Sequence, residues 1–142
     1  VEAHYHSYEE GMAAAKAQGK PVLIDFTGFG CVNCRKMEAA VWTDPTVADM
    51  LNNQYVLISL YVDDKTPLAE PVEVSLNGQQ RTLRTVGDKW SYLQASKFGA
   101  NAQPYYIAID NDGRPLNHAY GFKEDVGAYI DYLQQGLNTY RR

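Results

Sequence analysis

The two cysteines of the chain, Cys31 and Cys34, are separated by only two residues and lie between segments of different character. An apolar run typical of a buried strand, residues 21–26, precedes them, and a run typical of a helix follows. A thiol at the N-terminus of a helix lies beside unpaired backbone N–H groups and the positive end of the helix dipole. We therefore expect a lowered pKa and an exposed sulfur for Cys31, and a deeper position for Cys34. This pattern indicates reversible thiol chemistry.

A permanent structural disulfide is the alternative for this pair. Closing so short a loop removes little conformational entropy from the unfolded chain, so such a disulfide would stabilise the fold only weakly. Two cysteines are also too few for a disulfide scaffold. We interpret the pair as a redox-active disulfide, with Cys31 as the nucleophile and Cys34 as the resolving thiol.

Length, composition and charge restrict the class of protein. The chain has 142 residues, 45% of them hydrophobic and 21% charged, which suits one domain with a sizeable core. Its formal net charge of −4 argues against nucleic-acid binding. The longest apolar run, residues 55–62, is far shorter than the roughly 20 residues that span a bilayer. Because the chain begins with Val1 and shows no signal peptide, we expect a single domain, residues 1–142, excised or processed from a larger protein.

Periodicity and turn residues predict alternating helices and strands. Helices are expected at residues 8–18, 31–42, 46–53, 89–98 and 124–137, and strands at residues 21–27, 55–62, 105–110 and 116–121. The first two strands flank a helix and should therefore be parallel, whereas the last two should form an antiparallel pair.

Helix caps are predicted at three positions. Ser7 and Glu10 have the spacing of a capping box. Asp44 should cap the helix that Pro45 opens, and Asp88 should cap the helix after it.

Residues 63–87 interrupt the alternation. Asn77 and Gly78 lie between two strand-like runs and predict a β-hairpin. Loops that leave the carboxyl ends of parallel strands gather at one edge, so this insertion should emerge on the side of the cysteines. It is either a surface decoration or a docking element for a partner protein.

The order of these elements, with CxxC opening the first long helix and an X-Pro pair before a late strand, resembles the thioredoxin fold. Residues 31–38 (CVNCRKME) and 41–47 (VWTDPTV) are similar to the C-terminal periplasmic domain of the DsbD-type thiol:disulfide interchange proteins. The resemblance covers nearly the whole chain apart from residues 63–87. It implies an α/β fold, a thioredoxin-like three-layer α/β/α sandwich with a mixed central sheet, to which the hairpin is added.

Two carboxylates are candidates for proton transfer. Asp25 lies inside an apolar strand, where burial should raise its pKa, and the resemblance assigns to it the exchange of a proton with Cys34. Glu38 falls on the same helical face as Cys31 and Cys34, and DsbD-type domains have a glutamate there. The alternatives are a strand-end Asp25 paired with a lysine and a plain surface Glu38. For Arg35 we favour a solvated helix residue over a charge that acts on the thiols.

The resemblance also indicates where a substrate would bind. Pro104 matches the proline that is cis in thioredoxin-like proteins, and the free backbone of Gln103 would pair with an extended substrate segment. The other expected contact residues are Gly30, Val32 and Asn33. Thioredoxin-like sites usually carry Trp where this chain has Gly30, and Phe29 could partly replace that ring.

The remaining distinctive residues are interpreted as structural. His4 and His6 form an HxH pair that could ligate a metal, but we favour solvated imidazoles. We expect core packing for the large aromatic residues and a structural or surface role for the third histidine: Trp42, Trp90, Phe98 and His118. We expect no metal and no organic cofactor.

The sequence thus predicts a disulfide reductase that acts on protein thiols and disulfides through Cys31 and Cys34. The resemblance implies electrons from a membrane-embedded redox domain of the same or a partner chain, a role such as cytochrome c biogenesis, and a periplasmic location tethered to the inner membrane. The alternatives are a free-standing thioredoxin-like oxidoreductase or isomerase, and a non-catalytic binding module with an inert disulfide on the same scaffold.

Overall fold

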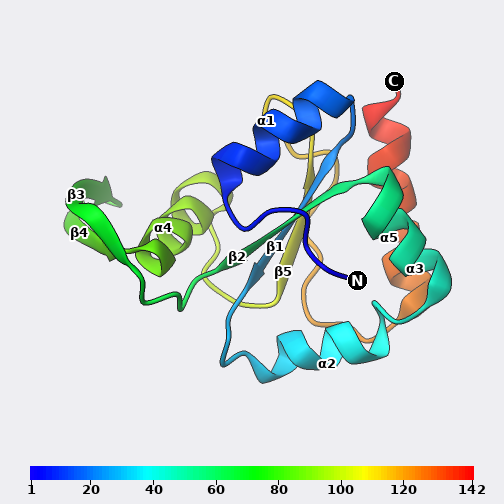
Figure 1. The fold of residues 1–142 in the computed structure, drawn as a ribbon, viewed down its shortest axis with the longest axis horizontal. Coiled ribbons are helices and arrows are strands. Elements are labelled where there is room, and N and C mark those ends of the chain that lie inside the picture. Colours follow the sequence, from blue (N-terminus) through cyan, green and yellow to red (C-terminus); the bar gives the residue numbers. More distant parts are fainter.

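A three-stranded mixed sheet forms the centre of the molecule in the computed structural model, which describes all residues 1–142 (Figure 1). Strand β1 (Val22–Thr27) is central, parallel to β2 (Val56–Tyr61) and antiparallel to β5 (Tyr105–Ile109). All residues of β1 are buried, because helices cover both faces of the sheet. The predicted parallel pair and the mixed sheet are confirmed.

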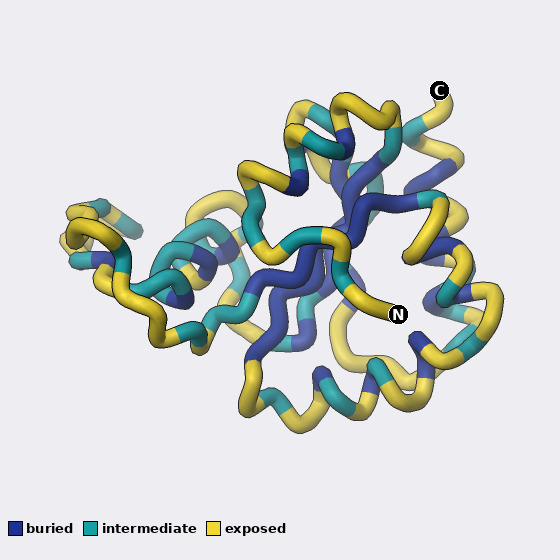
Figure 2. Tube along the Cα trace, viewed as in Figure 1, coloured by how far each residue is buried: buried dark blue, intermediate teal, exposed yellow.

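Helices cover the two faces of the sheet in two groups. Their bounds are α1 (Tyr8–Gln18), α2 (Val32–Ala40), α3 (Pro45–Asp49), α4 (Val86–Phe98) and α5 (Val126–Tyr140), and a π-helical turn η1 (Met50–Gln54) continues α3. Side chains of α1 and α4 pack on Val22 and Ile24, whereas those of α2, α3 and α5 pack on Leu23. Successive strand residues point to opposite faces, so each face has its own core. Figure 2 shows buried residues along the central strands. None of the helices has the length and apolar character needed to cross a membrane.

Only one of the three predicted caps forms as expected. Asp44 accepts hydrogen bonds from the backbone N–H groups of Thr46 and Val47. Ser7 is the N-cap residue of α1 as predicted, but the capping box with Glu10 does not form, because the hydroxyl of Ser7 donates to Glu9 instead.

At the start of α4, the prediction of Asp88 as the cap is also wrong. Thr85 is the N-cap, and its hydroxyl accepts from the backbone of Asp88. The carboxylate of Asp88 accepts in return from the backbone N–H of Thr85 at 3.1 Å. The two residues therefore form a reciprocal capping box, with Asp88 as its third helical residue.

The predicted hairpin is present as a separate two-stranded sheet. Strands β3 (Pro67–Leu76) and β4 (Gln79–Thr85) are antiparallel, and Asn77 and Gly78 connect them with φ angles of 52° and 78°. Figure 1 shows this hairpin beyond α4, at the opposite end of the molecule from α3 and α5. Its root, directly after β2, lies on the side of the cysteines as predicted, but its body extends away from them.

Residues 116–121 do not form the predicted strand. They run antiparallel to β5 as predicted, but make with it only an isolated bridge, between Tyr106 and Tyr120, and one backbone hydrogen bond, from Leu116 to Ala108. Pro115 makes another antiparallel bridge with Ile109. Between these bridges, the side chain of Asn117 accepts the backbone N–H of His118 at 2.8 Å. This local hydrogen bond replaces the ladder bond that a strand would use.

Candidate active site

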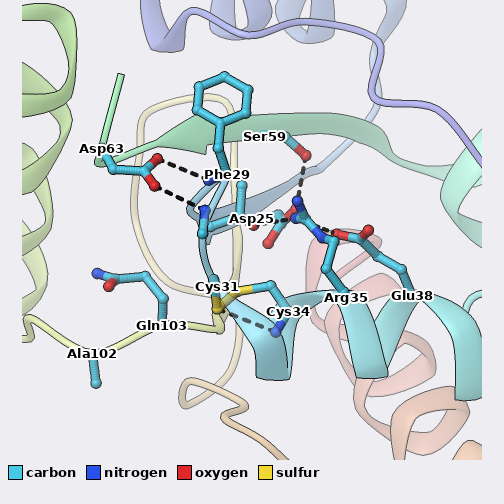
Figure 3. Close-up of a disulfide and its surroundings, with 12 residues drawn as sticks. Asp25, Phe29, Cys31, Cys34, Arg35, Glu38, Ser59, Asp63, Ala102 and Gln103 are labelled. Carbon is cyan, nitrogen blue, oxygen red and sulfur yellow. Dashed lines mark hydrogen bonds and ion pairs between the residues drawn. A yellow bond between two sulfur atoms is a disulfide. The ribbon is translucent and has the colours of Figure 1, made fainter. Parts of the chain in front are cut away.

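Cys31 and Cys34 form a disulfide at the N-terminus of α2 (Figure 3). Cys31 is the N-cap residue, and its sulfur accepts the backbone N–H of Cys34 at 3.2 Å. Cys34 is 1% exposed, whereas Cys31 is only partly buried. A disulfide of another protein can therefore reach the sulfur of Cys31 but not that of Cys34. This difference in exposure is the one that the sequence predicted.

Asp25 lies in the middle of β1 on the face covered by α2. It is 2% exposed, and the hydroxyl of Ser59, its register partner on β2, donates to one carboxylate oxygen at 2.8 Å. Burial is the main cause that raises the pKa of Asp25, to about 7, and the negative charge of Glu38 raises it further. The hydrogen bond from Ser59 and the positive charge of Arg35 act in the opposite direction. The alternative of a lysine partner is wrong, because no lysine pairs with Asp25. A carboxyl group with this pKa can take up or release a proton near neutral pH.

The sequence interpretation overlooked Ser59. It is a polar residue in the middle of an apolar strand, and it is 4% exposed. Its position in the run VLISLY and the predicted parallel pairing with β1 together would have placed it beside Asp25.

Arg35 and Glu38 form a charged pair on α2 above the end of β1. One guanidinium nitrogen of Arg35 donates to Glu38 at 2.9 Å and to the hydroxyl of Thr27, a fully buried residue, at 3.0 Å. The two side chains are 41% and 32% exposed. The interpretation of Arg35 as a solvated helix residue is therefore wrong, because its length lets it reach from the helix to the strand (Figure 3).

Asp63, the second residue after β2, holds the loop that leads to Cys31. Its two carboxylate oxygens accept the backbone N–H groups of Phe29 at 2.8 Å and Gly30 at 3.0 Å. Slight desolvation opposes these hydrogen bonds, but they lower the pKa of Asp63. Asp63 was not a predicted site residue, since nothing in the sequence near the cysteines indicates a contact with the start of the hairpin.

The surface around Cys31 carries exposed apolar groups. Phe29 is 62% exposed and stacks on Tyr61, with ring centroids 4.1 Å apart, and Val32 is 67% exposed. Asn33 is exposed beside Val32. Gly30 itself offers no side chain, so Phe29 is the aromatic ring nearest in sequence to the nucleophile.

The peptide bond between Gln103 and Pro104 is cis, as the resemblance implied. Figure 3 shows Gln103 on the segment beside the disulfide. Neither backbone polar group of Gln103 forms a hydrogen bond within the protein. Its side chain donates to the fully buried Gln94, which in turn donates to the backbone of Ala102, both at 2.9 Å. Gln94 therefore fixes the segment and leaves the backbone of Gln103 available.

The histidines contact the backbone. His4 accepts the N–H of Leu57 through Nδ1 at 2.8 Å, so its Nε2 carries the proton and donates to the carbonyl of Asn52 at 3.0 Å. His6 bonds the carbonyl of Ser59. Both residues are exposed, as expected, but each imidazole also makes a hydrogen bond to the backbone. Both rings tie the N-terminal segment to the rest of the fold. His118 is exposed and contacts only local backbone. The structure shows no group of three or more His, Cys, Asp or Glu side chains able to hold a metal ion.

Trp42 and Trp90 are buried, and the indole of Trp42 donates to the hydroxyl of Tyr129 at 3.1 Å. Phe98 packs against the core that contains Trp90. Their predicted role in packing is confirmed.

Comparisons with known proteins agree with this geometry. The family described as thioredoxin-like matches residues 3–82. The thiol:disulfide interchange protein DsbD of Pseudoalteromonas atlantica is 31% identical over an alignment of 109 residues, which covers 68% of this chain and 18% of that protein. DsbD 1 of Pseudomonas aeruginosa is 32% identical over an alignment of 90 residues, which covers 61% of this chain and 15% of that protein. The chain thus spans less than a fifth of the length of these two relatives.

Solved structures share the fold at low sequence identity. A DsbH oxidoreductase has a TM-score of 0.69 and 17% identity, with 97% of this chain and 86% of that chain covered. The reduced C-terminal domain of DsbD from Neisseria meningitidis has a TM-score of 0.61 and 18% identity, with 93% of this chain and 98% of that domain covered. These similarities confirm the predicted fold class.

Proposed function

Because this chain belongs to the thioredoxin-like family, we propose that it is a thiol:disulfide oxidoreductase that reduces disulfides of other proteins. One observation carries the proposal. An accessible sulfur and a buried sulfur share one disulfide, and a buried acid with a pKa of about 7 lies on the covered side. These are the groups that a two-step dithiol–disulfide exchange requires.

In the first step, the thiolate of Cys31 attacks one sulfur of the partner's disulfide. The S–S bond of the partner breaks, a mixed disulfide forms, and the released partner sulfur takes up a proton. In the second step, Cys34 gives its proton to Asp25 and its thiolate attacks the sulfur of Cys31. The second partner sulfur leaves and is protonated. Two electrons and two protons have then passed to the partner, and the disulfide of this structure has formed.

The positions of Gln103 and Phe29 suit this reaction. The free backbone groups of Gln103 can hydrogen-bond an extended partner segment that places its disulfide at Cys31. Phe29 and Val32 offer apolar contacts on the exposed side, with Gly30 in the loop between them and Asn33 beside Val32 in the first turn of α2. Both electrons come from the two sulfurs, so the exchange uses no metal and no organic cofactor.

The proposal also names a source of the electrons that Cys31 and Cys34 pass on. Relatives named DsbD are several times longer than this chain, so a further redox domain, embedded in a membrane, is a suitable donor to Cys31 and Cys34. The donor would belong to the same chain or to a partner chain. The proposal places the domain in the periplasm, where it would pass electrons to thiol proteins, those of cytochrome c biogenesis among them.

The Cys34→Ser variant tests the reaction. We expect it to accumulate mixed disulfides with a model disulfide protein through Cys31, because the second step is blocked. Mass spectrometry of the products under non-reducing conditions measures this accumulation.

Cys31→Ser is the matched control, and it should trap nothing because the remaining sulfur is buried. If neither variant forms a mixed disulfide and the reduced wild-type protein does not reduce a small disulfide, the chain is a binding module on this scaffold.

A further inference from the structure

Arg35 joins two elements that carry the site. Its guanidinium lies between the end of β1 and the second turn of α2, with Thr27 on one side and Glu38 on the other, at 3.0 and 2.9 Å. Its side chain is 41% exposed, but its Nε is buried and has no hydrogen-bond partner. Holding Arg35 in this orientation therefore costs solvation free energy, because the buried Nε has lost its hydrogen bond to water.

The contact with Thr27 is an unusual use of an arginine at this surface. The hydroxyl of Thr27 is buried, and Arg35 is its hydrogen-bond partner. An ion pair three residues apart on a helix stabilises the helix little, so the pair with Glu38 alone does not account for this conformation. The strand contact fixes the positive charge on the side of the helix that faces Asp25.

The groups around Asp25 come from four elements. Ser59 and Tyr61 belong to β2, Tyr106 to β5 and Tyr129 to α5, and α2 supplies Arg35 and Glu38. Figure 3 shows Cys34 on the same helix. Among these groups Arg35 is the one cation, and its charge and that of Glu38 act on Asp25 with opposite sign.

We propose that Arg35 is a positioning residue of the dithiol site, which holds the Glu38 carboxylate in place and supplies the positive charge that allows the buried acid beside it to ionise. The proposal rests on the proposed function and adds a residue to it. Asp25 must be ionised before Cys34 can transfer a proton to it, and it becomes ionised again when it returns that proton to solvent. In both cases Arg35 balances the negative charge on the buried carboxylate. Without that cation, Asp25 and Glu38 would be two like charges facing each other.

The test compares Arg35→Met with Lys36→Met. Both variants remove one positive charge from α2, but Lys36 is exposed and makes no hydrogen bond or ion pair. Two profiles are measured in the reduced proteins, the titration of the Asp25 carboxyl by carbon NMR and the pH dependence of Cys31 alkylation. We expect Arg35→Met to move both midpoints upward by about half a unit to one unit, the lower end of the effect of a nearby charge because Arg35 is partly exposed. Lys36→Met should leave both midpoints within about 0.2 units of wild type.

Two further variants separate charge from position. Arg35→Lys keeps the charge, so the Asp25 midpoint should return at least halfway to the wild-type value. Thr27→Val removes the hydroxyl that anchors Arg35 and keeps the charge and the side-chain volume, so it should move the midpoints in the same direction as Arg35→Met by a smaller amount. A purely structural role would lower the unfolding midpoint in these variants and leave the titrations unchanged.

Equal titrations in Arg35→Met and Lys36→Met would overturn the proposal. This result is distinct from failure of the proposed function, because the titrations need no substrate. Loss of disulfide reduction in the wild type with a shifted Asp25 titration in Arg35→Met would reject the reductase and retain the role of Arg35.

Discussion

Asp25 places an acidic group inside the best-protected strand of the molecule. Its pKa of about 7 means that the folded chain holds a proton on Asp25 at pH values where the unfolded chain has lost it. Stability must then fall as pH rises from about 4 to about 7, since the native state binds more protons than the unfolded state over this range.

Asp25→Asn should remove this pH dependence. At about pH 3 and below, the variant and the wild type should have similar free energies of unfolding, because the wild-type carboxyl is then largely neutral in both states. At pH 8 the variant should be more stable by up to about 4 kcal/mol, the upper limit set by a pKa difference of about three units. Urea unfolding of the oxidised proteins at both pH values measures the difference. A constant difference between the two pH values would show that the carboxyl is not buried as described.

At this scale the sequence indicated residues whose own chemistry is unusual. The two thiols and an acid in an apolar run can be recognised without a structure, and so can a proline before a strand. Residues that act through their contacts, such as Asp63 and Ser59, were missed, because the contacts cross more than 30 positions of the sequence. Arg35 was misjudged for a different reason. Its partner Thr27 is only eight positions away, but the contact joins a helix to a strand and depends on how the two elements pack.

Among the elements, the hairpin of β3 and β4 differs most from its surroundings. Most of its residues are exposed, and both of its outer edges lack a neighbouring strand. Such edges can pair with another chain. Its last residue, Thr85, caps α4, so the hairpin can be shortened without losing that cap only if Thr85 is retained.

Removing residues 70–84 should weaken exchange with protein partners and leave the reduction of a small disulfide intact. The expected loss is several-fold in the rate with a protein disulfide such as insulin, because a backbone docking edge is lost while Cys31 and Cys34 are unchanged. The ratio of the two rates, protein disulfide over small aromatic disulfide, is the measurement. If the ratio stays the same, the hairpin is a surface decoration.

The sequence predicted turns and helix ends well where one or two residues determine the backbone conformation by themselves. Asn77 and Gly78 fix the turn of the hairpin, and Gly19 and Gly99 end α1 and α4 in the left-handed conformation. The missing strand at residues 116–121 shows the limit, because a side-chain hydrogen bond at Asn117 competed with the ladder. Whether a side chain takes the place of a ladder hydrogen bond depends on the path of the backbone, so the pattern of apolar residues in the sequence cannot predict it.

In the whole molecule, the distance between layers is set at a few close contacts. Gly136 of α5 lies against the sheet, where a Cβ atom would overlap the hydroxyl of Tyr55 and come within 3.2 Å of Ala108. The hydroxyl of Tyr55 donates to the carbonyl of Leu133 on the same helix at 2.7 Å. The hydrogen bond from Tyr55 therefore holds α5 against the sheet at Gly136, the position where the helix has no side chain.

Gly136→Ala should destabilise the fold by about 1–3 kcal/mol, the usual range for an added buried methyl group, in spite of the better helix propensity of alanine. Gly127→Ala on the same helix is the control, because this residue is exposed and a Cβ atom there meets only Asp125 at 3.5 Å. The control should be neutral or more stable by up to about 1 kcal/mol. Urea unfolding of both variants gives the two values, and equal effects would place α5 farther from the sheet.

The arrangement of layers followed from the order of predicted strands and helices, and the two separate cores followed from the alternation along β1. The close approach at Gly136 could not be predicted in this way. From the sequence, a glycine inside a helix only indicates a lower helix propensity. The position of Tyr55, directly before β2, shows why a side chain is excluded at Gly136.

The unequal exposure of the two sulfurs also determines how the protein would respond to peroxide. In the reduced state, an oxidant reaches Cys31 first and converts its thiolate to a sulfenic acid, while Cys34 remains shielded by the core. Cys34 lies within bonding distance, so it condenses with the sulfenic acid and expels water. The product is the same disulfide that the proposed exchange forms. Oxidation at this site would therefore stop at a disulfide that a reductant can return to the dithiol, before the irreversible sulfinic acid is reached.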